Sequence, residues 1–307
     1  MRIQLPKRFN IERMLNHVRA SSYGLPYQFV GQSVLRRPLR ITGIPAITEF
    51  DLSRAGSMGL NVVSCHRDIE WSGRKQTTLR RELAAQARFL WGIDGNDGHL
   101  ASMASDPIMA PLLARFGGLR IIRATDMYEA LLVAVIGQQV SVQAAQSVRR
   151  RLMVTIGTRV SVNSGRSREK YYLYPTPRQL TKAGESGLCD QGVSRQKARY
   201  LLEIATRTVA GELDCGIFTA MNDEDAIRYL CEIKGVGRWT AEVALMRGLD
   251  RTDIFPAGDL GLQSALQKLL GMTERPSETE LRERAEHWAG WRSYAALYLW
   301  ITLQRGT

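Results

Sequence analysis

The chain has 307 residues, which is long enough to bury the core of more than one subdomain. Its 42 lysines and arginines outnumber its 30 aspartates and glutamates, and the net charge of +12 favours a polyanionic partner such as nucleic acid over a purely solubilising role. No apolar run is long enough to span a bilayer and the N-terminus lacks a signal-peptide pattern, so we expect a cytoplasmic protein without membrane contact.

The cysteines are few and scattered. None of the four forms a C-x-x-C pair, which argues against a disulfide framework or a zinc site and is typical of a reducing compartment. They are Cys65, Cys189, Cys215 and Cys231.

The first part of the chain predicts a small antiparallel sheet. A short helix is expected at Ile11–Arg19, and residues 78–117 turn helical, with one helix at Leu79–Trp91 and another starting at Asp106. We therefore expect an α+β fold, with an N-terminal antiparallel sheet domain (residues 1–105) followed by a mainly α-helical region (residues 106–307). The expected strands are Tyr27–Val34, Leu39–Ile44, Ile47–Leu52 and Leu60–Cys65, all short and interrupted by Gly, Pro or Ser.

Two helices with an interruption between them follow. Asp126–Gln139 is a strongly predicted helix with a capping-box-like start, and Ser141 is the expected N-cap of the next helix. Gln138 and Gln139 place two amides at the junction. Amides there suit the edge of a flipped base or the gap that it leaves in DNA, and solvent-facing glutamines are the alternative.

Residues 157–170 are polar, basic and rich in Gly and Ser, and they predict a mobile surface loop. Beyond them, Ser194 is the expected N-cap of a helix that runs to Arg207. Three cations at its start form a second candidate phosphate contact: Arg195, Lys197 and Arg199.

The stretch from Leu230 to Leu260 predicts a helix, a tight hairpin, a second helix and a loop that ends at an aspartate. Two glycines in the hairpin permit positive φ angles, and N–H groups exposed at a helix N-terminus bind anions, here a DNA phosphate. An ordinary joint between helices is the alternative. The candidate phosphate contacts are Lys234, Gly235, Val236, Gly237, Arg238 and Thr240.

Asp259 follows a loop stiffened by Pro256 and Gly258, and it precedes an apolar helix that ends at Gly271. Its simplest role is that of an N-cap. Near the C-terminus, Ser277-x-x-Glu280 predicts a capping box, and the last helix carries an aromatic stripe that includes Trp300.

The order of glycine hairpin, helix, Gly/Pro loop and aspartate resembles the signature of the helix-hairpin-helix DNA glycosylase superfamily. Within it the chain is most similar to the bacterial 3-methyladenine DNA glycosylase II family, and residues 1–110 match only loosely. The matching segments are Asp126–Ser141, Tyr174–Leu180, Ile233–Ala241, Asp253–Asp259 and Ala285–Trp300.

The resemblance implies a base excision repair enzyme that flips alkylated purines out of double-stranded DNA and hydrolyses their N-glycosidic bond in a cleft between helical subdomains. It implies an N-terminal domain like half of the TATA-binding fold, a monomeric state, and Asp259 as the catalytic carboxylate. Superfamily lyases have a Schiff-base lysine where this chain has Trp239, which implies a monofunctional enzyme. The implied base pocket contains Trp239, Trp300, Gln138, Gln139, Leu260, Val243 and His17.

The resemblance further implies a monovalent cation, Na⁺ or K⁺, on the backbone carbonyls of Cys231, Ile233 and Val236, and no required cofactor. The scattered cysteines leave no place for the iron–sulfur cluster of some superfamily members. Other lesions (hypoxanthine, 1-methyladenine or an oxidised base) stay open as substrates, because Val243 and Leu260 stand where the family often has tyrosines. A non-enzymatic helix-hairpin-helix DNA-binding protein is the alternative from another class.

Overall fold

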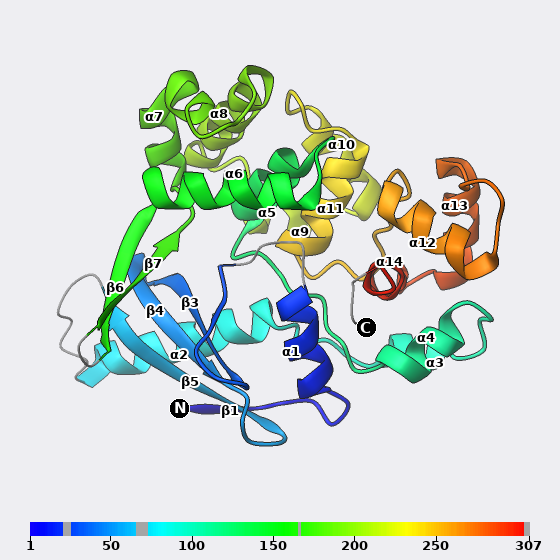
Figure 1. Cartoon of the computed structure of the whole chain (residues 1–307), viewed down its shortest axis with the longest axis horizontal. Helices are drawn as coiled ribbons and strands as arrows, with labels where there is room; N and C mark the ends of the chain where they lie inside the picture. The colour runs from blue at the N-terminus through cyan, green and yellow to red at the C-terminus, as the bar shows by residue number, and fades with distance from the viewer. Residues whose placement is uncertain (21–25, 66–72, 165–166, 304–307) are drawn as a thin grey trace.

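The computed structural model describes residues 1–20, 26–65, 73–164 and 167–303. An antiparallel sheet lies at one end of the molecule and helices form the rest, as Figure 1 shows. The predicted α+β class is therefore confirmed, and the structure places the sheet at the N-terminal end of the chain.

The sheet has the strand order β1-β5-β4-β3-β2, and every neighbouring pair is antiparallel. Thr42 and Gly43 join β3 to β4 with φ angles of 50° and 77°, which suit a two-residue hairpin turn. The predicted strand Leu39–Ile44 is therefore wrong, because the chain reverses inside it. The strands are β1 (Arg2–Gln4), β2 (Gln28–Phe29), β3 (Val34–Ile41), β4 (Ile44–Asp51) and β5 (Ser57–Cys65).

Two helices accompany the sheet, α1 (Ile11–Ala20) and α2 (Gly73–Leu90), near the predicted positions. Phe50 of β4 and Trp91, just after α2, lie in contact in the fully buried core, with ring centroids 5.7 Å apart. An aromatic core thus joins the sheet to the first helical segment.

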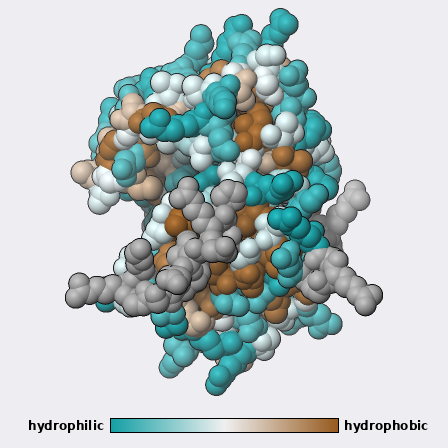
Figure 2. Space-filling view, turned by 90° about the vertical axis from the view of Figure 1, so that its left-hand side faces the viewer, coloured by the Kyte–Doolittle hydropathy of each residue, from teal (hydrophilic) through white to brown (hydrophobic). Residues whose placement is uncertain are grey.

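The described part of residues 157–170, which excludes 165 and 166, is not a loop. It forms most of a β-hairpin, β6 (Thr158–Ser164) and β7 (Ser167–Leu173), that contacts β3, β4 and β5. Val160 and Tyr171 are buried against Ile47 of the sheet. The polar residues that suggested a loop alternate with these apolar ones, as expected for a strand with one buried face. Figure 2 shows the side of the molecule on which the hairpin lies, where hydrophobic and hydrophilic residues intermingle and the outline narrows between an upper and a lower part.

The helical part is built around one helix, α5, in which every residue from Met127 to Ile136 is buried. It lies against α6, α8 and α11. The helices of this part are α5 (Met127–Gly137), α6 (Val142–Thr155), α7 (Pro177–Cys189), α8 (Arg195–Val209), α9 (Cys215–Thr219), α10 (Asp223–Cys231) and α11 (Arg238–Gly248).

The C-terminal helices α12 (Leu260–Leu270), α13 (Glu278–Ala285) and α14 (Arg292–Ile301), with the short 3₁₀ turn η1 (Glu286–Trp288), lie beside α3 (Gly98–Ser102) and α4 (Met109–Phe116) (Figure 1). His99 of α3 stacks on Tyr294 of α14 with ring centroids 3.9 Å apart. The expected boundary at residue 105 thus falls between two helices that both reach the C-terminal helices, and the hairpin β6–β7 returns to the sheet. The division into two domains stays a prediction.

Most predicted caps are present. The side chains of Ser141 and Ser194 each accept the expected backbone N–H, and Ser277 with Glu280 forms a capping box. Asn222 caps α10 in the same way as the two serines. The start of α5 differs, because the Glu129 carboxylate is turned to Arg37 and does not complete a capping box. No helix among the described residues is long and apolar enough to cross a membrane.

Candidate active site and nucleic-acid interface

Asp259 is the N-cap of α12. Its Oδ1 accepts the N–H of Leu262 at 3.0 Å, and its own N–H donates to the carbonyl of Pro256 at 2.9 Å. Upstream, the N–H of Ile254 donates to Ser293 Oγ at 3.0 Å. The loop that delivers the carboxylate is therefore fixed at both ends by hydrogen bonds.

Two tryptophans from distant parts of the chain meet at this carboxylate. Trp239 Nε1, from α11, donates to Asp259 Oδ2 at 3.0 Å, and Trp300 Nε1, from α14, donates to Oδ1 at 2.9 Å. All three side chains are partly exposed. The structure thus brings together the three residues on which the predicted chemistry depends. Their catalytic and base-stacking roles stay predictions.

Gly261, which the sequence motifs did not identify, leaves room for the cluster of Asp259 and Trp300. A Cβ atom here would lie 2.8 Å from Asp259 Oδ1 and 3.6 Å from Trp300 Cδ1. Any side chain would therefore push on the carboxylate, whereas the indole would stay at an ordinary contact distance. The sequence feature that could have identified Gly261 is its position two residues after the candidate catalytic aspartate.

The hairpin before α11 has the backbone that its glycines suggest. Gly235 has a φ of 86°, and a Cβ there would lie 2.1 Å from the ring of Tyr200 on α8. Gly237 is the N-cap of α11 and supplies no side-chain cap, so the first N–H groups of the helix lack that partner. Lys234 is exposed beside them. This end of α11 is suited to an anion.

Three of the expected phosphate contacts are engaged elsewhere. The N–H of Val236 donates to the Ile233 carbonyl at 2.9 Å, and the Thr240 hydroxyl is buried and accepts from Gln138 at 2.9 Å. Arg238 is held by Glu224 and Glu242. Lys234 and the backbone at the start of α11 stay the available candidates.

The junction between α5 and α6 is clamped to the hairpin. Gln138 Nε2 donates to the Gly235 carbonyl and to Thr240 Oγ1, both at 2.9 Å, so its amide does not point freely toward a base as expected. Lys197 Nζ donates to the carbonyls of Ile136 and Gln138 at 3.0 and 2.6 Å, and burial lowers the pKa of this lysine. Lys197 is therefore a cap for α5 and not a free phosphate ligand.

Gln139 behaves differently from its neighbour. It is exposed, and its φ of 53° lies in the left-handed region that non-glycine residues seldom adopt. Residues in such sparsely populated backbone conformations cluster at active and binding sites. Gln139 remains the amide of this junction that is available to DNA.

The remaining predicted pocket residues are dispersed. Val243 is 1% exposed inside α11, His17 is 4% exposed on α1, and Leu260 is 64% exposed next to Asp259. Only Leu260 offers a free apolar surface beside the carboxylate. The pocket roles of Val243 and His17 stay predictions, and both side chains are buried in this structure.

Residues 132–290 match the family described as HhH-GPD superfamily base excision DNA repair protein, which is more than half of the chain. The chain belongs to this superfamily. The resemblance inferred from the sequence motifs is thereby confirmed.

Two relatives match nearly the whole chain, and a third matches about two thirds of it. A DNA-3-methyladenine glycosylase of Bacillus subtilis is 27% identical over 98% of this chain and 96% of its own length. A 3-methyladenine DNA glycosylase structure from Archaeoglobus fulgidus superposes with a TM-score of 0.81 at 26% identity, covering 98% of this chain and 97% of that one. The Schizosaccharomyces pombe enzyme Mag1, solved with abasic DNA, has a TM-score of 0.59 at 27% identity, over 68% of this chain and 98% of its own.

Proposed function

We propose that this protein is a monofunctional DNA glycosylase that excises alkylated purines, 3-methyladenine and 7-methylguanine, from double-stranded DNA and leaves an abasic site. The observation that carries the proposal is the Asp259 carboxylate, which two indole N–H groups and the start of α12 hold directly after a helix-hairpin-helix unit. We infer further that the enzyme acts as a cytoplasmic monomer.

The chemistry follows from the charge of the damaged base. Methylation at N3 or N7 makes the purine cationic, so the electron pair of the breaking bond between C1′ and the base neutralises the leaving group. The sugar becomes oxocarbenium-like, and the fixed carboxylate of Asp259 stabilises that developing positive charge. Water then adds to C1′ and releases one proton. A cationic leaving group needs no general acid, so one carboxylate suffices, unlike the pair used by glycoside hydrolases.

Aromatic rings beside the carboxylate suit a cationic base. Trp239 and Trp300 reach Asp259 through their ring nitrogens, and their faces supply stacking and cation–π attraction for a flipped purine. The exposed Leu260 adds an apolar surface. Aromatic faces next to a carboxylate favour positively charged bases over neutral ones.

DNA would be held at the hairpin. Lys234 and the uncapped N–H groups at the start of α11 would contact phosphates without reading sequence, as befits an enzyme that searches for damage. The exposed Gln139 would enter the gap left by the flipped nucleotide. Both contacts lie on segments that Gln138 binds together.

A monovalent cation at the hairpin fits the donors present. The carbonyls of Cys231, Ile233 and Val236 are neutral oxygen ligands, which suit Na⁺ or K⁺, and the Ile233 carbonyl also accepts the N–H of Val236. Among the described residues, no cluster of His, Cys, Asp and Glu could hold a metal ion. A bound cation would add positive charge beside a phosphate. Weaker DNA binding in tetramethylammonium than in K⁺ at equal ionic strength would support this site.

The test is base release from duplex DNA with one 7-methylguanine or 3-methyladenine. We expect the free base to appear, the strand to stay intact until alkali is added, and borohydride to trap no adduct. A trapped adduct would contradict the monofunctional mechanism. Release of only hypoxanthine, 1-methyladenine or an oxidised base would show that the enzyme acts on that lesion and not on 3-methyladenine or 7-methylguanine. DNA binding without release of any base would favour the non-enzymatic alternative.

A further inference from the structure

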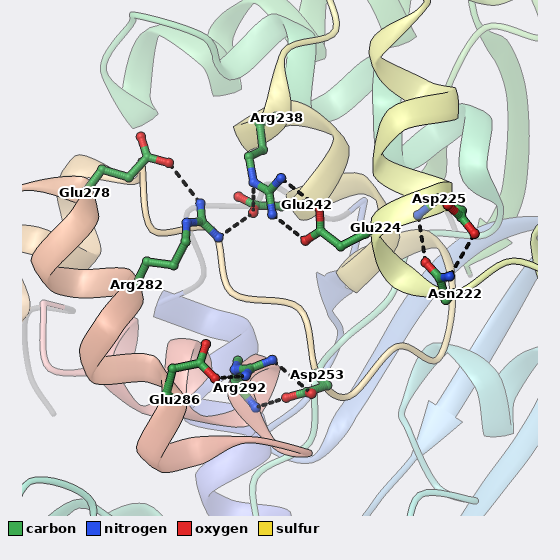
Figure 3. Close-up of polar contacts among 10 residues, drawn as sticks. All are labelled: Asn222, Glu224, Asp225, Arg238, Glu242, Asp253, Glu278, Arg282, Glu286 and Arg292. Carbon is green, nitrogen blue, oxygen red and sulfur yellow. Dashed lines mark hydrogen bonds and ion pairs between the residues drawn. The ribbon is translucent and has the colours of Figure 1, made fainter.

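A buried carboxylate joins two arginines close to the active site. Glu242 of α11 has a side chain only 2% exposed, and its Oε1 accepts from Arg238 Nε and from Arg282 Nη1, each at 3.0 Å. Figure 3 shows both guanidinium groups converging on it from different helices. Burial raises the pKa of Glu242, and the two arginines oppose that shift. Both arginines thus bind one oxygen of a buried carboxylate, and its other oxygen, Oε2, is buried without a hydrogen-bond partner among the described residues.

Each arginine holds a second carboxylate. Arg238 binds Glu224 of α10 at 2.5 and 2.9 Å, and Arg282 binds Glu278 one turn earlier on α13 at 2.8 Å (Figure 3). Both arginines thus act as two-sided forks, a geometry that a lysine cannot reproduce.

The Glu242 network reaches Asp259 by two routes. On one side, Trp239 is the residue after Arg238, and its indole donates to Asp259 Oδ2. On the other side, the Glu278 carboxylate lies beside Gly258, the residue before Asp259, since a Cβ built on that glycine would lie 3.1 Å from Glu278 Oε2. The ion pairs from Arg238 through Glu242 and Arg282 to Glu278 therefore run from the chain neighbour of Trp239 to the side of Gly258. We call this network, together with Trp239 and Asp259, the ring.

We propose that Glu242 and Arg282 are positioning residues that set the orientation of the Asp259 carboxylate by locking α11 to α13. The ion pair between them fixes the distance between α11, which supplies the indole donor, and α13, whose Glu278 lies beside Gly258. Displacement of a catalytic group by about 1 Å costs on the order of a hundredfold in rate. The inference rests on the proposed function, since its kinetic consequence is slower base excision.

The chain offers a matched control. Arg36 also bridges two carboxylates, Glu49 and Glu169, each at 2.9 Å, but it lies in the β-sheet and its partners reach no part of the Asp259 loop. Substitution of Arg36 reports the general cost of losing a two-sided ion pair. Substitution of Arg282 reports the same general cost plus any effect that the ring has on Asp259.

The experiment compares Arg282→Gln and Arg282→Lys with Arg36→Gln and Arg36→Lys. We expect both Arg282 variants to lower the single-turnover excision rate at saturating enzyme by about tenfold or more, because lysine keeps the charge but cannot bind both carboxylates. Their affinity for abasic DNA should stay within about twofold of the wild type. The Arg36 variants should keep the wild-type rate, even where they lower the melting temperature.

A second readout does not depend on activity. The chain has six tryptophans, so ¹⁵N-labelled indole signals can be resolved and that of Trp239 assigned with Trp239→Phe. We expect Arg282→Gln, but not Arg36→Gln, to shift the Trp239 signal and to speed its hydrogen exchange.

The two readouts separate the inference from the function. A wild type that releases no alkylated base, together with a Trp239 signal that moves in Arg282→Gln, would refute the proposed function and keep the ring. Wild-type excision rates and an unmoved Trp239 signal in both Arg282 variants would overturn the ring. So would a rate loss that equals the loss in the Arg36 variants.

Discussion

At the scale of single residues, the site depends on the side chains of Asp259, Trp239 and Trp300. It also depends on the lack of a side chain at Gly261. The resemblance to the glycosylase family implied Asp259, Trp239 and Trp300 as site residues, and for Asp259 it rests on the order of hairpin, loop and aspartate, which is a local pattern. The sequence motifs could not predict that both indoles donate to the same carboxylate, or that Gly261 leaves room for this, because those contacts join residues 20 and 41 positions apart in the chain. Gln138 illustrates the same limit, since its amide donates to the carbonyl of Gly235, in a hairpin that follows much later in the sequence.

Gly261→Ala should slow excision by about tenfold or more, because its Cβ would lie 2.8 Å from Asp259 Oδ1 and displace the carboxylate. Gly216→Ala is the matched control. Gly216 also lies two residues after an N-cap aspartate, Asp214, but its Cβ would lie an ordinary 4.0 Å from that carboxylate. Single-turnover kinetics of both variants decide the matter. Equal rates in the two would show that the close approach at Gly261 has no catalytic consequence.

At the scale of elements, local signals predicted the helices well and the strands less well. Caps such as Asn222 and Ser277 mark helix starts within a few residues, so they can be predicted from sequence. The hairpin β6–β7 was missed because its composition is that of a loop, although the alternation of Val160 and Val162 with polar residues was a strand signal. The sheet residues that bury these valines, Ile47 and Val63, lie roughly a hundred residues earlier in the sequence.

Glu129→Gln should lower the free energy of unfolding by about 3–5 kcal/mol. Arg37 of β3 pairs with Glu129 of α5 at 2.7 Å, with side chains 1% and 8% exposed, so the variant leaves a buried guanidinium without its counter-charge. Glu49→Gln, which removes a more exposed partner from Arg36, should cost less than about 1 kcal/mol. Urea unfolding of the three proteins measures both values. Similar losses in the two variants would contradict the importance of burial here.

Protonation of His99 should limit stability in acid. Burial, with the nearby Arg120 charge, lowers its folded-state pKa to about 4 from 6.5, so the unfolded chain takes up a proton below pH 6.5 that the folded protein refuses until about pH 4. Stability that is complete above pH 6.5 should therefore fall by about 3 kcal/mol on the way to pH 4. His99→Phe should lose less over that range. The difference between the two proteins, measured by unfolding at each pH, isolates this residue from other titrating groups.

At the scale of the whole molecule, the net charge of +12 indicated nucleic acid before any motif did. The logarithm of the DNA affinity should fall linearly with the logarithm of salt concentration, with a slope of about 0.9 per neutralised phosphate. Lys234→Met should reduce that slope by about one unit, because the exposed ammonium lies at the hairpin. Arg54→Met, an exposed change in the turn between β4 and β5, should leave it unchanged. Equal slopes for Lys234→Met and the wild type would remove the hairpin lysine from the DNA interface.

The most direct test of the account is single-turnover excision of 7-methylguanine by Asp259→Asn, measured beside its affinity for abasic DNA. Asparagine can still accept the N–H of Leu262, so the cap of α12 and the fold should survive while the negative charge is lost. We predict a fall in rate of about a hundredfold or more, with abasic-DNA affinity near that of the wild type. A variant that excises the base at the wild-type rate would contradict the assignment of Asp259 as the group that stabilises the transition state.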